Sequence, residues 1–518
     1  MKYQILLKAL DQLCSEAPAG LNYCPNLEDQ DSLNNARSKA FIHLYLKVKC
    51  GLVTFNEQFY QITDGSQDGG IDAYHIDTEK KKLLLIQSKF GSNRDNFEMK
   101  KISASDLVKM DISRVLKGEE KGSNGQEFNI KIKLFQKRWK EITDQAHYKY
   151  EVIILGNLAN YNDEQIKRLI ENSDYEVFNF ERTYNELLFP LCSGTYYDPK
   201  EIRIKINLFN KEQSTLKQKI ATGFGEFQVR IVFVPAKEIG RIMLKYKNSI
   251  LKYNPRHYLS LSKNKVNQKI KESILNKTTN DFAIFNNGIT MLADTFEQSE
   301  TTGTKDVGQL IMTNPQIING GQTAYTLSKV YEELDSNEEI LDKKFGDKEV
   351  MLKVIVLGSG IEPNLKFIEE ISNATNQQSR VEEADRRSNE KIQIELQKKI
   401  FEEFGLLYER KRGEFFNGVD KKFIAPENLI ERYDFLRAYL AFKGSPGSAR
   451  RSGGETLFKS NSFKKIVGDG QDFKRMVFSL IVIPHSLLWG QAKEKQLNPF
   501  FLLNKWKICA KVVIRFLE

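Results

Sequence analysis

A short stretch at residues 67–90 combines a carboxylate, an amide and an amine in a pattern suited to binding a metal ion and a phosphate. Asp72 ends the sequence GGID, and an apolar run farther on ends in Gln87, Ser88 and Lys89. Carboxylate and amide oxygens are ligands that Mg²⁺ accepts, while a lysine can orient an attacking water or neutralise charge on a phosphate. We therefore predict a catalytic site in which Asp72 and Gln87 are metal ligands and Lys89 is the catalytic cation.

Two strands must position these residues. Residues 71–76 are rich in β-branched and aromatic side chains, residues 83–87 are almost continuously apolar, and a charged turn separates them. This predicts an antiparallel pair in which Gln87 and Lys89 share one face and Asp72 lies beside them on the partner strand. The glycine pair before Asp72 would let a phosphodiester backbone approach closely. The alternative interpretation is a polar hairpin tip with a lysine that extends into solvent.

These motifs carry a resemblance. GGID, a short hairpin and an apolar strand ending in QSK resemble the PD-(D/E)XK nucleases, in particular the Mrr-type restriction endonuclease branch, in which glutamine commonly replaces the second acidic residue. The positions that carry over are Asp72, Gln87 and Lys89. The resemblance implies a metal-dependent DNA endonuclease that uses Mg²⁺, with Mn²⁺ as the alternative ion.

One feature departs from that family. Its members often add a glutamate from a preceding helix, but the helix predicted at residues 33–49 contains no acidic residue. Glu57, Asp64 and Asp68 are the candidates to replace it. If none does, the site is degenerate, and the protein is a non-catalytic sensor that binds nucleic acid or a nucleotide.

The hydrophobic periodicity after the hairpin predicts further helices and strands of the same domain. Residues 104–117 and 163–172 have helical spacing, whereas residues 149–155 and 175–180 read as strands. A strand, a helix and a strand in that order predict a parallel pair, and hence an α/β/α sandwich.

The second half carries five ordered motifs. They are NPRHYLSLSKNKVNQKI from Asn254, FAIFNNGITML from Phe282, NPQIINGGQTAYTL from Asn314, NATNQQSRV from Asn373 and YERKRG from Tyr408. Together they resemble the AIPR family, named for abortive infection and phage resistance, over about residues 224–413. This resemblance implies a role in phage defence.

The motif INGGQT predicts a turn from a strand into the helix expected at residues 324–334. The N–H groups at such a helix start suit an anion, so a phosphate or nucleotide is a candidate ligand. The equally weighted alternative is that Asn319 and Gln322 satisfy buried backbone groups, and that the arginines of YERKRG form a salt-bridged surface. The candidate ligand-binding residues are Asn319, Gly320, Gly321, Gln322, Thr323, Asn376, Gln378, Arg410 and Arg412.

The composition favours a polyanionic partner. The 518 residues include 78 Lys and Arg against 68 Asp and Glu, which gives a formal net charge of +10. A basic chain binds DNA through its phosphates, so we expect salt-sensitive and largely sequence-independent DNA binding. Acidic residues are mixed among the basic ones, so the excess is moderate.

Other functional classes lack support. The sequence has no GxxxxGK[ST] motif, which excludes a P-loop NTPase, and its five histidines are isolated, so histidine metal sites and Ser-His hydrolases are unsupported. The five cysteines have no metal-binding spacing, and we identify neither a signal peptide nor an apolar span of membrane length. We therefore expect a cytoplasmic protein with reduced thiols and no membrane partner.

These observations predict an α/β protein of three regions. Residues 1–190 are expected to form a restriction-endonuclease-like α/β/α sandwich, residues 200–415 a mixed α+β AIPR core, and residues 416–518 a mainly helical C-terminal region. The predicted function is a Mg²⁺-dependent DNA endonuclease for phage defence, regulated by the AIPR region. Because cutting both DNA strands commonly needs two active sites, a homodimer is expected.

Overall fold

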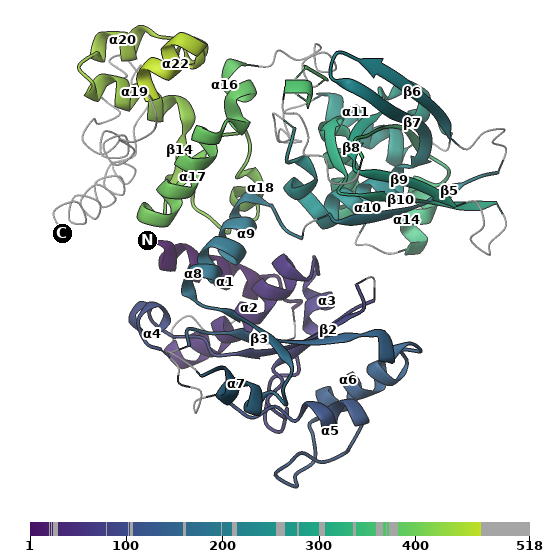
Figure 1. Cartoon of the computed structure of the whole chain (residues 1–518), viewed down its shortest axis with the longest axis vertical. Helices are drawn as coiled ribbons and strands as arrows, with labels where there is room; N and C mark the ends of the chain where they lie inside the picture. The colour runs from purple at the N-terminus through teal and green to yellow at the C-terminus, as the bar shows by residue number, and fades with distance from the viewer. Residues whose placement is uncertain are drawn as a thin grey trace. The chain divides into compact units, whose positions relative to one another are not determined.

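The computed structural model describes most of the chain and divides it into two compact units (Figure 1). One comprises residues 2–197 and 420–424, called here the N-terminal unit, and the other, the C-terminal unit, comprises the remaining residues. The described residues are 1–19, 21, 23, 29–78, 80–101, 103, 107–158, 162–197, 199–209, 215–254, 265–276, 279–299, 306–334, 338–358, 366–368, 370–371 and 382–467. Both units mix helices with sheets, which confirms the predicted α/β class at this level.

The N-terminal unit alternates helices and strands. Its elements are α1 (Lys2–Ser15), α2 (Gln30–Lys49), α3 (Phe55–Phe59), β1 (Ala73–Asp77), β2 (Lys82–Ser88), α4 (Arg94–Glu98), α5 (Ile112–Lys117), α6 (Ile130–Lys140), β3 (Lys149–Leu155), α7 (Asp163–Leu169), β4 (Asp174–Phe178), α8 (Phe180–Arg182), the π-helical turn Thr183–Leu188 and α9 (Phe189–Ser193).

The described strands of this unit form one sheet in the order β1-β2-β3-β4. β1 and β2 are antiparallel, with Ala73 opposite Ile86, so the predicted hairpin is confirmed. β3 is parallel to both β2 and β4, which confirms the predicted parallel pair. β2 lies inside the sheet, and its apolar residues Leu83, Leu85 and Ile86 are buried, as its sequence predicts.

Helices cover both faces of this sheet (Figure 1). On one face, side chains of β2 and β3 pack against α5, α6 and α7 in a cluster that includes Trp139, Phe135 and Ile166. On the other face lies α2, whose Phe41 packs its ring 5.4 Å from that of Phe90 just beyond β2. Burial of apolar side chains on both faces is what a central parallel strand requires.

Some predicted boundaries are wrong. The helix predicted at residues 104–117 begins only at Ile112 within the described residues. The helix predicted to reach residue 172 ends at Leu169, because Glu171 and Asn172 adopt positive φ angles of 52° and 61°, which an α-helix does not tolerate.

The C-terminal unit is longer. Its elements are β5 (Glu201–Asn207), β6 (Leu216–Thr222), β7 (Gly225–Pro235), α10 (Ala236–Tyr246), the 3₁₀ helix η4 (Lys247–Leu251), α11 (Lys265–Leu275), α12 (Phe282–Phe285), β8 (Ile289–Ala293), β9 (Thr295–Ser299), β10 (Val307–Thr313), β11 (Gln316–Asn319), α13 (Gly321–Glu333), α14 (Glu338–Phe345), β12 (Glu349–Val356), α16 (Glu383–Arg386), α17 (Lys391–Phe404), β13 (Leu407–Glu409), α18 (Phe416–Asp420), β14 (Leu429–Glu431), α19 (Arg432–Phe442), α20 (Pro446–Arg451), α21 (Gly454–Phe458) and α22 (Ser460–Val467).

The described strands of the C-terminal unit form sheets in the orders β11-β8-β12-β7-β6, β5-β10-β9 and β13-β14. The Ser, Gly and Arg content of residues 444–454 predicts a mobile loop, but this prediction is wrong because the stretch contains α20. Pro446 stands at the first helical position, where its missing N–H has no cost, and Ala449 is buried. Within the described part of the chain, no helix has the length and apolar character needed to cross a membrane.

The turn before β1 depends on a glycine. Gly70 has a φ of +76°, and a Cβ atom there would lie 2.8 Å from the Lys109 carbonyl oxygen. Both the backbone angle and the close approach exclude other residues. Glycine is therefore required here by the packing of the protein itself. The sequence had suggested only that the glycine pair lets a phosphodiester backbone approach.

We predict that Gly70→Ala lowers the free energy of unfolding of the N-terminal unit by clearly more than Gly125→Ala does. Gly125 is a matched control because its φ is +77° but nothing lies within 4 Å of a Cβ added there. The control should lose only about 1 kcal/mol, the cost of the left-handed angle, and denaturant titration measures both. Equal losses would show that the approach to Lys109 is not limiting.

Candidate active site

Asp72 lies where three chain segments meet. Its backbone N–H donates to the Ile86 carbonyl at 2.8 Å, and its carboxylate Oδ2 accepts from the Ser88 backbone N–H at 2.6 Å. Its own carbonyl accepts hydrogen bonds of 2.9 Å from the N–H groups of both Thr63 and Asp64. Asp72 therefore ties the end of β2 to residues 62–64, which lie along the other side of β1.

This pairing brings two further carboxylates to Asp72. Asp64 is the neighbour of Asp72 across that backbone pairing. Asp68 folds back within the connecting loop, where its two oxygens accept from the N–H groups of Gly70 at 2.9 Å and Gly65 at 3.1 Å. One oxygen each from Asp64, Asp68 and Asp72 lies within 4.8 Å of the others.

Two of the three candidates for the missing acidic residue are thus at the site. Glu57 is not, because it completes a capping box at the start of α3, where its carboxylate accepts from the backbone and hydroxyl of Thr54 at 2.8 Å. The sequence contains one indication of this clustering, which is the spacing of four residues between successive aspartates with glycines between them.

Gln87 is buried, with only 3% of its surface exposed. Its amide nitrogen donates to the carbonyls of Gly70 at 3.1 Å and Val108 at 2.9 Å, which fixes the orientation of the amide. No hydrogen bond reaches its Oε1 within the described part of the chain. The nitrogen therefore supports the aspartate loop, and the oxygen is left as a candidate ligand.

Lys89 follows the last residue of β2, and its backbone N–H continues the sheet by donating to the Leu155 carbonyl at 2.8 Å. The Lys89 ammonium forms no salt bridge with a described carboxylate. Its charge nevertheless acts on Asp68 and Asp72, whose carboxyl pKa values it lowers. Lys89 is thus close to the carboxylates without being neutralised by direct contact.

The electrostatics of the cluster favour a cation. Burial, together with the negative charges of Asp68 and Asp64, raises the pKa of Asp72 to about 7, against the opposing effects of the Ser88 N–H and Lys89. Burial also raises the pKa of Asp68. Crowded, partly buried carboxylates resist ionisation, and a divalent ion relieves that repulsion.

The donor set fits the predicted ion. Asp64, Asp68 and Asp72 offer carboxylate oxygens and Gln87 an amide oxygen, and Mg²⁺ and Mn²⁺ both accept oxygen ligands. The structure therefore brings together the three residues predicted from the sequence and adds two carboxylates to them. Metal binding and catalysis by these residues stay predictions.

In the C-terminal unit, INGGQT forms the predicted turn from β11 into α13. Gly320 has a φ of +81°, and a Cβ atom there would lie 2.8 Å from the Gly288 carbonyl oxygen, so this glycine has a packing requirement. Asn319 Oδ1 accepts from the Gly320 N–H at 2.8 Å, and Thr323 Oγ1 accepts from Asn286 at 3.3 Å. The N-cap residue of α13 is Gly320, which has no side chain with which to cap the helix.

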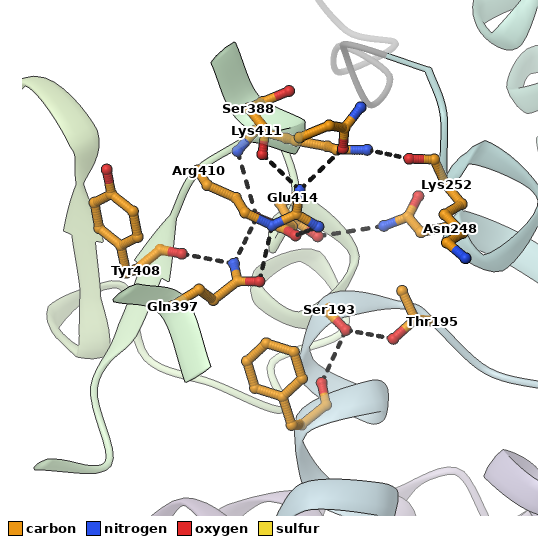
Figure 2. A network of polar contacts seen from close by, with 12 residues as sticks. Ser193, Thr195, Asn248, Lys252, Ser388, Gln397, Tyr408, Arg410, Lys411 and Glu414 are labelled. Atoms are coloured by element: carbon orange, nitrogen blue, oxygen red, sulfur yellow. Dashed lines mark hydrogen bonds and ion pairs between the residues drawn. The ribbon is translucent and has the colours of Figure 1, made fainter. Parts of the chain in front are cut away.

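The two arginines predicted to bind phosphate have different environments. Arg410 donates to Gln397 Oε1 at 3.0 Å and the Ser388 carbonyl at 2.8 Å, and it forms a salt bridge of 3.2 Å with buried Glu414 (Figure 2). Arg412 is 52% exposed, and its nearest described carboxylate is Glu382 at 4.0 Å. The guanidinium of Arg410 is thus bonded to other groups of the protein.

Lys411, which lies between these two arginines in the sequence, is buried and donates to the Lys252 carbonyl at 2.6 Å (Figure 2). It also donates to the Asn254 carbonyl at 3.0 Å. The alternative expectation of a salt-bridged surface agrees with exposed Arg412, which pairs with Glu382, whereas the salt bridge of Arg410 with Glu414 lies in the interior. Ligand binding at Asn319, Gly320, Gly321, Gln322 and Thr323 stays a prediction, and Asn376 and Gln378 lie outside the described residues.

A depression of about 700 Å³ lies elsewhere, over β3 and β4, and none of the predicted site residues lines it. Four of its charged groups form the pairs Arg182–Glu176 at 3.0 Å and Lys167–Asp163 at 3.0 Å. We therefore assign no chemistry to it.

The pKa of Asp72 leads to a pH prediction for the metal-free protein. Between pH 4 and 7 the folded state holds a proton that the unfolded chain releases, so this carboxyl makes the protein less stable as the pH rises through that range. Asp72→Asn removes the effect, and at pH 8 in EDTA it should be more stable than wild type by up to about 4 kcal/mol. Urea titrations at both ends of the range measure the difference, which should vanish near pH 4. A difference that does not change with pH would contradict the raised pKa.

A second prediction compares the arginines of YERKRG. Arg410→Met leaves buried Glu414 without its charged partner, so it should lower the free energy of unfolding by about 3–5 kcal/mol. Arg412→Met removes the same charge from an exposed side chain and should change it by less than about 0.5 kcal/mol. Equal effects in chemical denaturation would show that the Arg410 network is not stabilising.

Comparison with known proteins bears on the C-terminal unit. Residues 251–496 match the family described as AIPR protein. No curated protein and no solved structure matches the chain. The match begins later and extends farther than the resemblance expected at residues 224–413. It confirms the AIPR resemblance for residues 251–496, while the nuclease resemblance of the N-terminal region stays a prediction.

Proposed function

We propose that the N-terminal unit is a Mg²⁺-dependent DNA endonuclease, and that the protein acts in defence against phage. The observation that carries the proposal is the meeting of three carboxylates within 4.8 Å, next to a lysine that has no described carboxylate partner. The position of this group at the end of an internal strand, in a sheet covered by helices on both faces, supports the resemblance to PD-(D/E)XK nucleases.

In this proposal, Asp72 is the principal metal ligand, Asp64 and Asp68 complete the carboxylate set, and Gln87 adds its amide oxygen. A bound divalent ion supplies Lewis acidity and a water of lowered pKa. Lys89 holds its ammonium near the reacting phosphate, where it stabilises developing negative charge. The backbone N–H of Ser88 keeps the Asp72 carboxylate oriented toward the other two.

The AIPR match at residues 251–496 supports a role in abortive-infection phage defence. We propose that this region regulates the nuclease, with the glycine-containing start of α13 as the candidate site for a nucleotide or phosphate. Cleavage of both strands of a duplex would need two copies of the single site, which favours a homodimer.

One observation favours a second candidate function. The Gln87 amide nitrogen donates hydrogen bonds to two backbone carbonyls, so glutamine at this position has a structural role that does not require a metal ion. If the metal does not bind, the basic chain is a nucleic-acid or nucleotide sensor without catalytic activity.

Cleavage of plasmid DNA by the purified full-length protein tests the proposal. Wild type should cut with Mg²⁺ or Mn²⁺ and not with EDTA. Asp72→Ala should abolish cutting, Lys89→Ala should slow it by about 10²–10³, and Gln87→Glu should keep it. Mg²⁺ should raise the melting temperature of wild type but not of Asp72→Ala, since a ligand at 100 times its Kd stabilises by about 2.7 kcal/mol.

Asp174→Asn is the matched control, because Asp174 is an exposed aspartate of the same unit at the start of β4. It should cut and bind metal as wild type does. Folded Asp72→Ala protein that cuts at the wild-type rate would contradict the assignment. Absence of any cutting by wild type, with either metal and with phage-infected cell extract as trigger, would favour the sensor.

A further inference from the structure

A second lysine reaches the carboxylate cluster from a different element. Lys131 lies in the first turn of α6, and its Nζ donates to the Asp64 backbone carbonyl at 2.8 Å. Nothing in the sequence distinguished this residue, because α6 contains several lysines. It was brought to the site by packing of α6 against the loop that carries the aspartates.

The start of α6 holds that loop in place. The Asn129 side-chain amide donates to the carbonyls of Thr63 and Ser66, both at 3.2 Å, and its backbone N–H donates to the Gln67 carbonyl at 3.0 Å. Asn129 Oδ1 also caps the helix by accepting from the Ile132 N–H at 3.0 Å. Because these contacts surround Asp64, the distance of Lys131 from the cluster is set by the fold.

The Lys131 ammonium is only partly used by these contacts. An ammonium has three N–H donors, and this one forms no other hydrogen bond and no salt bridge within the described residues. Lys133, two residues farther on, forms a 2.8 Å salt bridge with Glu127 instead. A half-buried cation whose one partner is a neutral carbonyl retains a strong attraction for an anion.

Lys131 and Lys89 both act on the carboxylates of the cluster, and they come from different elements. The charge of Lys89 acts on Asp72 and Asp68, whereas Asp64 and Asp68 are the carboxylates that act on Lys131. A phosphodiester brought to these carboxylates by a metal ion would therefore lie near a second ammonium in addition to that of Lys89.

We propose that Lys131 is a second phosphate-binding lysine of this site, which contacts a non-bridging oxygen of the DNA phosphate at or next to the scissile bond. This inference rests on the proposed nuclease function. Lys131 thereby contributes to DNA binding before cleavage and to stabilisation of charge during it.

The test uses Lys131→Met and, as the matched control, Lys133→Met, which removes the same charge from the same helix. Binding of a duplex oligonucleotide is measured against salt concentration with Ca²⁺ in place of Mg²⁺, so that the readout does not depend on cleavage. Lys131→Met should lower the magnitude of the log K against log[salt] slope by about 0.9, the value for one phosphate contact. Lys133→Met should leave the slope unchanged.

Single-turnover cleavage then separates substrate contact from loop support. Lys131→Met should cut about 10²–10³ times more slowly while binding Mn²⁺ with unchanged affinity, and Lys131→Arg should restore part of the rate. If Lys131→Met does not fold, Lys131→Gln carries the same expectations, because its amide still offers a donor to the Asp64 carbonyl.

The proposal is overturned if folded Lys131→Met, or Lys131→Gln in its place, keeps the wild-type salt slope. It is also overturned if the variant loses Mn²⁺ affinity in parallel with its rate, since Lys131 would then only support the loop. Wild-type protein that cuts no DNA refutes the nuclease function instead, and that result is distinct from either outcome for Lys131.

Discussion

The organisation of the N-terminal unit depends on the backbone of Asp72, which is shared among three chain segments. Its N–H and carboxylate are bound by the end of β2, while its carbonyl accepts from the N–H groups of Thr63 and Asp64. Satisfying these buried backbone groups forces carboxylates from successive turns of one loop into a single cluster. Burial and the repulsion that results raise the pKa of Asp72, and a cation would relieve that repulsion. In the proposed metal site, fold stability and affinity for a divalent ion would therefore be linked through Asp72.

In the C-terminal unit, charged side chains are buried in a network in which each has a hydrogen-bond partner. Lys411, Arg410 and Glu414 lie in the interior, where backbone carbonyls and amide side chains such as Gln397 complete their hydrogen bonds (Figure 2). Such a network joins β13 and α17 to the segment after η4, and the Asn254 side chain carries the connection on to the Ile318 carbonyl at 3.4 Å. A buried charge network is costly unless complete, so it favours one arrangement of these motifs over others. The described parts of the motifs that begin at Asn254, Asn314 and Tyr408 are therefore connected in space although they are far apart in the sequence.

The secondary structure could be predicted from the sequence in segments that are mostly apolar and buried. The run at residues 83–87 and the strand at 149–155 are apolar enough to identify β2 and β3, and their pairing followed from the turn and the helix between strands. Boundaries were less predictable, because they depend on single φ angles such as that of Asn172. Residues 444–454 were misinterpreted because their composition resembles a loop, while the burial of Ala449 against the rest of the unit makes them helical.

For the candidate site, the sequence by itself determined the hairpin and therefore the meeting of Asp72, Gln87 and Lys89, since strand periodicity and a short turn leave few other registers. The sequence left three candidates for the additional carboxylate, namely Glu57, Asp64 and Asp68, and did not distinguish among them. The tertiary structure does: backbone pairing beside β1 brings Asp64 close to Asp72, whereas Glu57 caps the start of α3. Lys131 was beyond prediction because its proximity depends on how α6 packs on the aspartate loop, and a local pattern carries no information on contacts between distant segments.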